Sequence, residues 1–260
     1  MTKMNLTTDQ VHLWFADQAD FDADQLQDRC VDWLTQEELA RYERFQIAKR
    51  RKEFLLGTML LRTVLSEYAN PNPEQWQFTR NAYGKPAIGE NLVRPGIFFN
   101  LSHSGNRLVL AVSRHPETGV DIEQSNRVRR IEKIAGRYFS KPEIDAMLKL
   151  DRNERLTRFY ELWTLKESYI KARGMGLALS LQQFGFELDS QNAIGFFTTS
   201  ELNDEPAAWR FWQLVPGGDY KLALAVRPDA EMGSGTVEAF QKTGIESYSP
   251  LEHQILRRSM

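Results

Sequence analysis

Two long segments with apolar residues at helical spacing, each followed by runs typical of β-strands, constrain the fold of this chain most. The first spans residues 50–68 and stops before Asn70-Pro71-Asn72-Pro73, because a residue that precedes proline disfavours helix. The second spans residues 158–173 and ends at Gly174, a residue common directly after helices. We therefore expect an α+β fold in which two long helices each pack on a sheet.

The predicted strands fall into two groups, and one pair of them is similar in sequence. Residues 108–112 read Leu-Val-Leu-Ala-Val, and residues 222–226 read Leu-Ala-Leu-Ala-Val. This echo indicates an internal duplication but does not establish one, since apolar strands resemble each other easily. The strands are expected at residues 11–16, 97–100, 107–113, 120–123, 184–188, 193–198, 209–215 and 221–226.

Two polar stretches are expected to lie outside the core. The acid-rich stretch 17–28 has few apolar residues, and we expect it at the surface. Residues 229–260 are polar and contain glycine and serine, which predicts an appended C-terminal tail.

Composition excludes several classes of protein. The 260 residues are 42% apolar and 26% charged, as in an ordinary globular chain, and the net charge of −2 provides no overall field for nucleic acid or an anionic membrane. The single cysteine, Cys30, cannot form an internal disulfide. The start, Met-Thr-Lys-Met-Asn, lacks the pattern of a signal peptide, and no apolar run approaches the roughly 20 residues of a membrane span. A cytoplasmic location is expected.

Three acids are candidates for holding a metal ion. Asp121 and Glu123 alternate on a predicted strand, so both side chains project from one face and could bind a hard cation. Such a pair alone is more often a solvated strand end. Glu167 and Lys171 lie one helical turn apart, which can also be an exposed ion pair, but Trp163 and neighbouring apolar residues place this acid beside a buried stripe.

Several other segments could contact phosphate. Ser102 and His103 lie where a predicted strand turns at Gly105, so a hydroxyl, an imidazole and backbone N–H groups could meet there. Lys85 lies in the turn Tyr83-Gly84-Lys85-Pro86. Taken singly, these residues also fit a structural histidine and a surface turn. The basic run, which could equally be a solvated helix face or a nucleic-acid patch, consists of Lys49, Arg50, Arg51 and Lys52.

These segments, in their order and spacing, resemble the 4′-phosphopantetheinyl transferase superfamily, closest to its long Sfp/HetI type. The resemblance covers roughly residues 10–228. It rests on Tyr-Gly-Lys-Pro at 83–86, Phe-Asn-Leu-Ser-His-Ser-Gly at 99–105, Gly-Val-Asp-Ile-Glu at 119–123, Tyr-Phe-Ser-Lys-Pro-Glu at 138–143 and the segment 159–171, which ends in Trp-Thr-Leu-Lys-Glu-Ser-Tyr-Ile-Lys. Thr118 departs from the apolar residue common in the family, and the basic run matches least well.

The resemblance implies a fold of two similar α/β halves related by a pseudo-twofold axis. Each half would be a small sheet packed with a long helix, and the active site would lie in the cleft between them. The N-terminal half would be residues 1–115, and the C-terminal half, residues 116–228, would carry the metal ligands. The enzyme is expected to be a monomer.

The resemblance also implies roles for single residues. Asp121, Glu123 and Glu167 would ligate Mg²⁺, with Mn²⁺ as a possible substitute. Lys171 and His103 would contact phosphates, with Ser102 beside His103. Lys85 and the basic run would lie near the 3′-phosphate of coenzyme A. Glu143 also matches an acid of the family, but a helix-capping role is sufficient for it.

The implied reaction is transfer of phosphopantetheine from coenzyme A to a serine of an apo acyl or peptidyl carrier protein, with release of 3′,5′-ADP. Glu167 is the candidate general base, and whether it ligates, deprotonates or does both stays open. Two alternatives use the same residues. A metal-dependent phosphohydrolase or nuclease would act without an acceptor protein. A non-catalytic binder of coenzyme A or carrier protein would be expected to lack one of the acids or Lys171.

Overall fold

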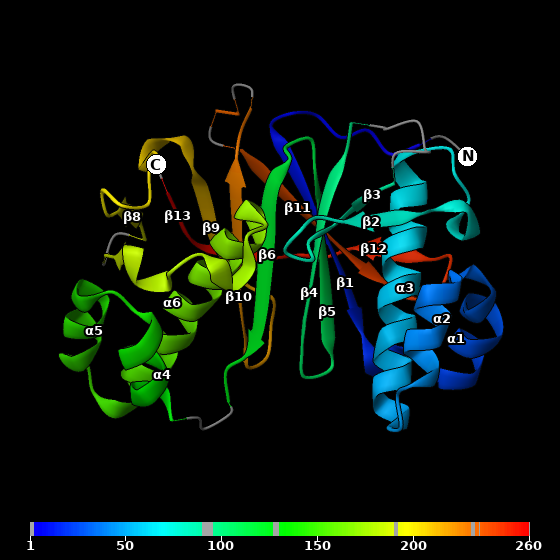
Figure 1. Cartoon of the computed structure of the whole chain (residues 1–260), viewed down its shortest axis with the longest axis horizontal. Coiled ribbons are helices and arrows are strands. Elements are labelled where there is room, and N and C mark those ends of the chain that lie inside the picture. Colours follow the sequence, from blue (N-terminus) through cyan, green and yellow to red (C-terminus); the bar gives the residue numbers. More distant parts are fainter. Residues whose placement is uncertain are drawn as a thin grey trace.

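Two β-sheets pack face to face in the middle of the molecule, and one long helix covers the outer face of each (Figure 1). The computed structural model describes residues 3–89, 96–126, 130–189, 192–229, 232–233 and 235–259. The five-stranded sheet has the order β12-β11-β1-β5-β4, and the four-stranded sheet has the order β13-β9-β10-β6. The apolar residues between the sheets come from both of them, so the sheets share one core.

The strands of the five-stranded sheet are β1 (Gln10–Asp17), β4 (Phe98–Ser104), β5 (Arg107–Ser113), β11 (Thr236–Lys242) and β12 (Tyr248–Pro250). Those of the four-stranded sheet are β6 (Glu117–Gln124), β9 (Arg210–Val215), β10 (Tyr220–Arg227) and β13 (Gln254–Arg258). Two hairpins stand apart, β2 (Phe78–Arg80) with β3 (Pro86–Ile88) and β7 (Phe184–Leu188) with β8 (Ile194–Thr198). The helices are α1 (Ala23–Cys30), α2 (Gln36–Glu43), α3 (Ala48–Tyr68), α4 (Ile131–Tyr138), α5 (Lys141–Leu148) and α6 (Arg152–Arg173).

The two halves repeat one arrangement of elements. In the first, β1, α3, β4 and β5 follow in the chain, and the strands pair antiparallel in the order β1-β5-β4. In the second, β6, α6, β9 and β10 follow in the chain, and the strands pair antiparallel in the order β6-β10-β9. The two echoed sequences, 108–112 and 222–226, therefore lie on equivalent strands, β5 and β10. The predicted α+β fold of two similar α/β halves is confirmed.

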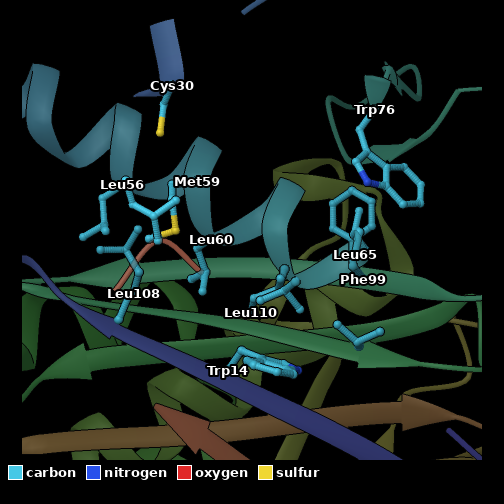
Figure 2. Packing of buried hydrophobic residues seen from close by; sticks show 14 of the residues in the cluster. Trp14, Cys30, Leu56, Met59, Leu60, Leu65, Trp76, Phe99, Leu108 and Leu110 are labelled. Carbon is cyan, nitrogen blue, oxygen red and sulfur yellow. The ribbon is translucent and has the colours of Figure 1, made fainter. Parts of the chain in front are cut away.

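Helix α3 is held by its apolar stripe, as its periodicity predicted. Leu56, Met59 and Leu60 are fully buried, and Figure 2 shows them pointing from α3 toward Leu108 of β5, with Trp14 of β1 further along the sheet. Each such leucine contributes about 1.5–3 kcal/mol by leaving water. The helix ends at Tyr68, two residues before the Asn-Pro-Asn-Pro segment.

Helix α6 packs unusually close to β6, and this places its polar residues beside that strand. A Cβ on Gly119 would lie 2.2 Å from the Ser168 carbonyl oxygen and 2.3 Å from the Ala172 nitrogen, so only glycine permits the approach. The helix begins with a capping box between Asp151 and Glu154. It thus starts six residues earlier than the sequence pattern predicted.

The C-terminal residues differ from the appended tail that their composition predicted. Strand β11 pairs in parallel with β1, and β13 pairs with β9, so residues 236–258 complete both sheets. Residues 230, 231, 234 and 260 lie outside the described residues.

The acid-rich stretch 17–28 was expected at the surface, yet part of it forms α1. Leu26 and Cys30 of this helix are fully buried in the core under α3. Two apolar residues four apart lie on the same face of a helix, so they are enough to pack this short and otherwise polar helix on the core. In the part of the chain that the structure describes, no helix combines the length and apolarity needed to cross a membrane.

Candidate active site

The two halves meet along β4 and β6, where side chains of one strand bond to the backbone of the other. Asn100 Oδ1, Ser102 Oγ and Ser104 Oγ accept hydrogen bonds from the backbone N–H groups of residues 120, 122 and 124, at 2.8, 3.3 and 3.1 Å. Alternate residues of β4 share one face and alternate residues of β6 supply the donors, so the spacing of both strands matches. We call these three residues the polar ladder.

The polar ladder also orients the two acids of β6. Ser102 Oγ donates to Asp121 Oδ1 at 2.9 Å, and Ser104 Oγ donates to Glu123 Oε2 at 2.7 Å. A hydroxyl that donates to a carboxylate fixes the direction in which that carboxylate points. The carboxylates predicted as metal ligands are therefore held at the junction of the halves by serines of the opposite half.

Asp121 lies between the two halves and is 5% exposed. The ammonium of Lys171 lies 2.6 Å from its Oδ1 and donates to Ser102 Oγ at 2.8 Å. The second carboxylate oxygen of Asp121, Oδ2, is buried and has no hydrogen-bond donor among the residues described. A buried carboxylate oxygen without a partner is costly, which suits an atom that awaits a cation.

Glu167 is close enough to the other acids for their charges to interact. Its pKa is raised to about 7, first by burial and then by the charges of Asp121 and Glu123, while Lys171 acts to lower it. Glu167 thus lies near the strand pair, and ligation of one cation by all three acids stays a prediction. A carboxyl group with a pKa near neutrality is suited to accept a proton.

The acids fit a hard cation in chemistry, although they do not enclose one in this arrangement. Within the described ranges, no group of three acidic, histidine or cysteine side chains is already set as a metal cage. The Lys171 ammonium instead neutralises Asp121. A divalent ion bound to oxygen ligands would give Oδ2 of Asp121 a partner, and its charge would favour the ionised form of Glu167.

Ser102 and His103 face opposite sides of β4, because neighbouring residues of a strand alternate. The Ser102 hydroxyl donates to Asp121 and accepts from Ile122 N–H and Lys171, which uses its one donor and both acceptor positions. It has no capacity left for a phosphate. The His103 side chain is 51% exposed on the other face, 3.4 Å from the carboxylate of Glu53.

Of the basic run, only Arg50 lines a pocket beside His103. This outer pocket, of about 350 Å³, lies between α2, α3 and β4. It is lined by phenylalanine rings, by cationic groups that include Arg41 and Arg80, and by two acids, Glu38 and Glu53. Lys49 bonds to Asn106 Oδ1 at 2.9 Å, and Arg51 bonds to the Phe45 carbonyl at 2.7 Å. Arg41 and Arg80 carried no signal in the sequence.

A second pocket, of about 270 Å³, lies between the halves. It is lined by Glu167 and Lys171 of α6 and by residues of the 83–86 turn and β4. Pro86 and Leu101 line both pockets, so the two are neighbours. The structure therefore brings Glu167 and Lys171 together in one pocket and places His103 and Arg50 in the next.

Glu143 and Lys85 are both engaged in structural bonds. Glu143 closes the capping box of α5 and pairs with Lys166 at 2.8 Å, and both side chains are fully buried. The Lys85 ammonium bonds to backbone carbonyls of the C-terminal half. Ser104 and Asn100 were not predicted as site residues, although each lies two residues from Ser102 on the same strand, which was a usable signal.

The fold and the site together define a protein of two α/β halves with an acid and lysine cluster at their junction, next to a cationic, aromatic-lined pocket. One family model, the 4′-phosphopantetheinyl transferase superfamily, matches residues 117–225, and the model for the N-terminal part of 4′-phosphopantetheinyl transferases matches residues 23–115. The chain belongs to the 4′-phosphopantetheinyl transferase superfamily.

Relatives match over most of the chain. The 4′-phosphopantetheinyl transferase HetI of Nostoc sp. is 33% identical over 86% of this chain and 90% of its own length. The 4′-phosphopantetheinyl transferase Sfp of Bacillus subtilis is also 33% identical, over 78% of this chain and 86% of its own. The L-aminoadipate-semialdehyde dehydrogenase-phosphopantetheinyl transferase of Xenopus laevis is 30% identical over 76% of this chain and 69% of its own. The similarity thus spans both halves.

Proposed function

We propose that this protein is a Mg²⁺-dependent 4′-phosphopantetheinyl transferase that moves phosphopantetheine from coenzyme A to a serine hydroxyl of an apo acyl or peptidyl carrier protein and releases 3′,5′-ADP. One observation carries the proposal. Glu167 and Lys171 of α6 line a pocket between the halves, and Lys171 bonds there to Asp121 of β6, in a chain whose relatives are phosphopantetheinyl transferases.

Coenzyme A would span the two neighbouring pockets. The outer pocket offers phenylalanine rings for the adenine, and Arg50, Arg41 and His103 for the 3′-phosphate. The diphosphate would then pass Pro86 and Leu101 and reach Lys171 in the pocket between the halves. This path agrees with the small size of each pocket, since neither alone would hold a whole dinucleotide-sized ligand.

Asp121, Glu123 and Glu167 would hold Mg²⁺, for which Mn²⁺ could substitute. Once bound, the ion would offset the charge of the diphosphate and of the departing ADP. The protein itself has little covalent work to do in a phosphoryl transfer, so positioning and charge dominate.

Glu167 and Lys171 would divide the remaining tasks. A Glu167 carboxylate with a pKa near 7 can accept the proton of the carrier serine as its oxygen attacks phosphorus. The Lys171 ammonium, now 2.6 Å from Asp121, can turn to the transferring or leaving oxygens when a metal ion takes that carboxylate. Ser102 and Ser104 would keep the acids aimed while this happens. We further propose that the enzyme acts as a cytoplasmic monomer.

The experiment that tests this function uses the purified chain, coenzyme A, Mg²⁺ and several apo carrier proteins. We expect each accepted carrier to gain the mass of one phosphopantetheine, and a carrier whose acceptor serine is replaced by alanine to gain none. Release of 3′,5′-ADP without a carrier would identify a hydrolase instead. Binding of coenzyme A without any product, with every carrier tried, would identify a binder.

A further inference from the structure

The turn between β2 and β3 crosses from the N-terminal half to the end of α6 in the other half (Figure 1). Lys85 Nζ donates to the carbonyl oxygens of Ala172, Thr118 and Pro116, at 2.8, 3.2 and 3.3 Å. Burial lowers the pKa of this ammonium to about 8, so at neutral pH it remains charged and has three N–H donors. All three are used by backbone of the opposite half.

Asn81 makes the same crossing two residues further along the chain. Its Nδ2 donates to the Gly174 carbonyl oxygen at 2.7 Å, while its Oδ1 accepts from the N–H groups of Tyr83 and Lys85 and so shapes the turn. Carbonyls in the last turn of a helix have no partner within it, and the helix dipole makes this end negative. An amide and an ammonium from the other half supply the missing donors and the complementary charge.

Gly174 shows how tightly this contact is built. Its φ of +63° is left-handed, and a Cβ there would lie 2.8 Å from Lys85 Cδ and 3.1 Å from Asn81 Nδ2. A glycine is therefore required both by the turn that ends α6 and by the approach of the two side chains.

We propose that Lys85 and Asn81 form a clasp that fixes the carboxyl end of α6, and that they are positioning residues rather than ligands of coenzyme A. The last two turns of α6 carry Glu167 and Lys171, so the clasp sets how these side chains meet Asp121 across the junction. The expected changes in kcat and KM rest on the proposed function, whereas the positioning of α6 by these two side chains does not. It replaces the role at the 3′-phosphate that the family resemblance implied for Lys85.

The test compares Lys85→Met, which keeps the stem and removes the donors, with Lys141→Met, an exposed lysine on α5. In the protein without any substrate, we expect amide hydrogens of residues 170–174 to exchange at least about tenfold faster in Lys85→Met, because about three modest hydrogen bonds are lost. Exchange at the wild-type rate would overturn the clasp, whatever reaction the protein catalyses.

Kinetics separate positioning from binding. In Lys85→Met we expect kcat to fall at least about tenfold while KM for coenzyme A changes less than about twofold, and the preference for coenzyme A over 3′-dephospho-coenzyme A stays as in wild type. Loss of that preference would show that Lys85 binds the 3′-phosphate and overturn the proposal. If Lys85→Met does not fold, Asn81→Ala removes one bond of the clasp and is expected to give the same pattern more weakly. A wild-type chain that transfers nothing would refute the proposed function but not the exchange result.

Discussion

The ammonium of Lys171 lies 2.6 Å from Oδ1 of Asp121, where it neutralises a carboxylate that is 5% exposed. A lysine in this position competes with any cation for the same carboxylate. Lys171 and a metal ion are therefore expected to exchange places on Asp121, and the released ammonium then faces the pocket between the halves.

Replacement of Lys171 by methionine should separate catalysis from metal binding. We expect turnover to fall by about 10²–10³, because a cation next to the transferring group is lost. Affinity for Mn²⁺, measured by calorimetry on the substrate-free protein, should stay the same or rise, because the carboxylate no longer has a competitor. A variant with normal turnover and about tenfold weaker Mn²⁺ binding would contradict this role.

Ser104 should act on the metal site through Glu123. It is 8% exposed, donates to Glu123 at 2.7 Å and accepts from Gln124 N–H at 3.1 Å. We expect Ser104→Ala to weaken Mn²⁺ binding by about tenfold, since partners that orient metal ligands commonly have effects of that size. Ser104→Thr keeps the hydroxyl and should restore binding. Ser125→Ala removes a half-buried serine whose hydroxyl bonds to the Asp219 carbonyl, and it should leave binding unchanged. Equal binding in Ser104→Ala and wild type would remove the serine from this role.

The sequence predicted most of the strands and both long helices because these depend on local spacing, whereas the meeting of the three acids was implied only by the family resemblance. Alternation put Asp121 and Glu123 on one face of β6, and a turn of helix put Glu167 above Lys171. The same alternation places Ser102 and His103 on opposite faces of β4. A phosphate on one face of β4 would therefore meet only one of these two side chains.

Other features depend on contacts between distant segments, which spacing does not reveal. The long, flexible side chain of Lys85 can reach many partners, and only the folded chain shows that it ends on three carbonyls of the opposite half. Strand β11 pairs with β1 across more than 200 residues of sequence. Its mixture of polar and apolar residues also occurs in a tail, so composition alone could not distinguish a strand from a tail.

Arg50 should contribute to recognition of the 3′-phosphate in the outer pocket. Its side chain is 57% exposed, and its contact with Glu53 at 3.0 Å keeps it at the outer pocket. We expect Arg50→Ala to raise KM for coenzyme A by about tenfold, as for one lost charge-assisted contact, and to leave KM for 3′-dephospho-coenzyme A nearly unchanged. Arg29→Ala, on the exposed side of α1, is the control. An equal rise for both substrates would place the 3′-phosphate elsewhere.

Glu167 should make the metal-free protein less stable as pH rises. Its pKa is about 7 in the folded chain, against an ordinary value of 4.5, so the folded state binds more protons than the unfolded state between these values. The stability that this group contributes is therefore complete below about pH 4.5 and is lost as pH rises to about 7. With a chelator present at pH 8, Glu167→Gln should be more stable than wild type by about 2 kcal/mol in urea unfolding. This is somewhat more than half of what the pKa difference between 4.5 and about 7 represents at about 1.4 kcal/mol per pKa unit. At pH 4.5 the two proteins should unfold alike, and saturating Mg²⁺ at pH 8 should stabilise wild type alone. A Glu167→Gln variant that is less stable than wild type at pH 8 without metal would show that the three acids do not repel one another, and would remove the charge argument for a cation between them.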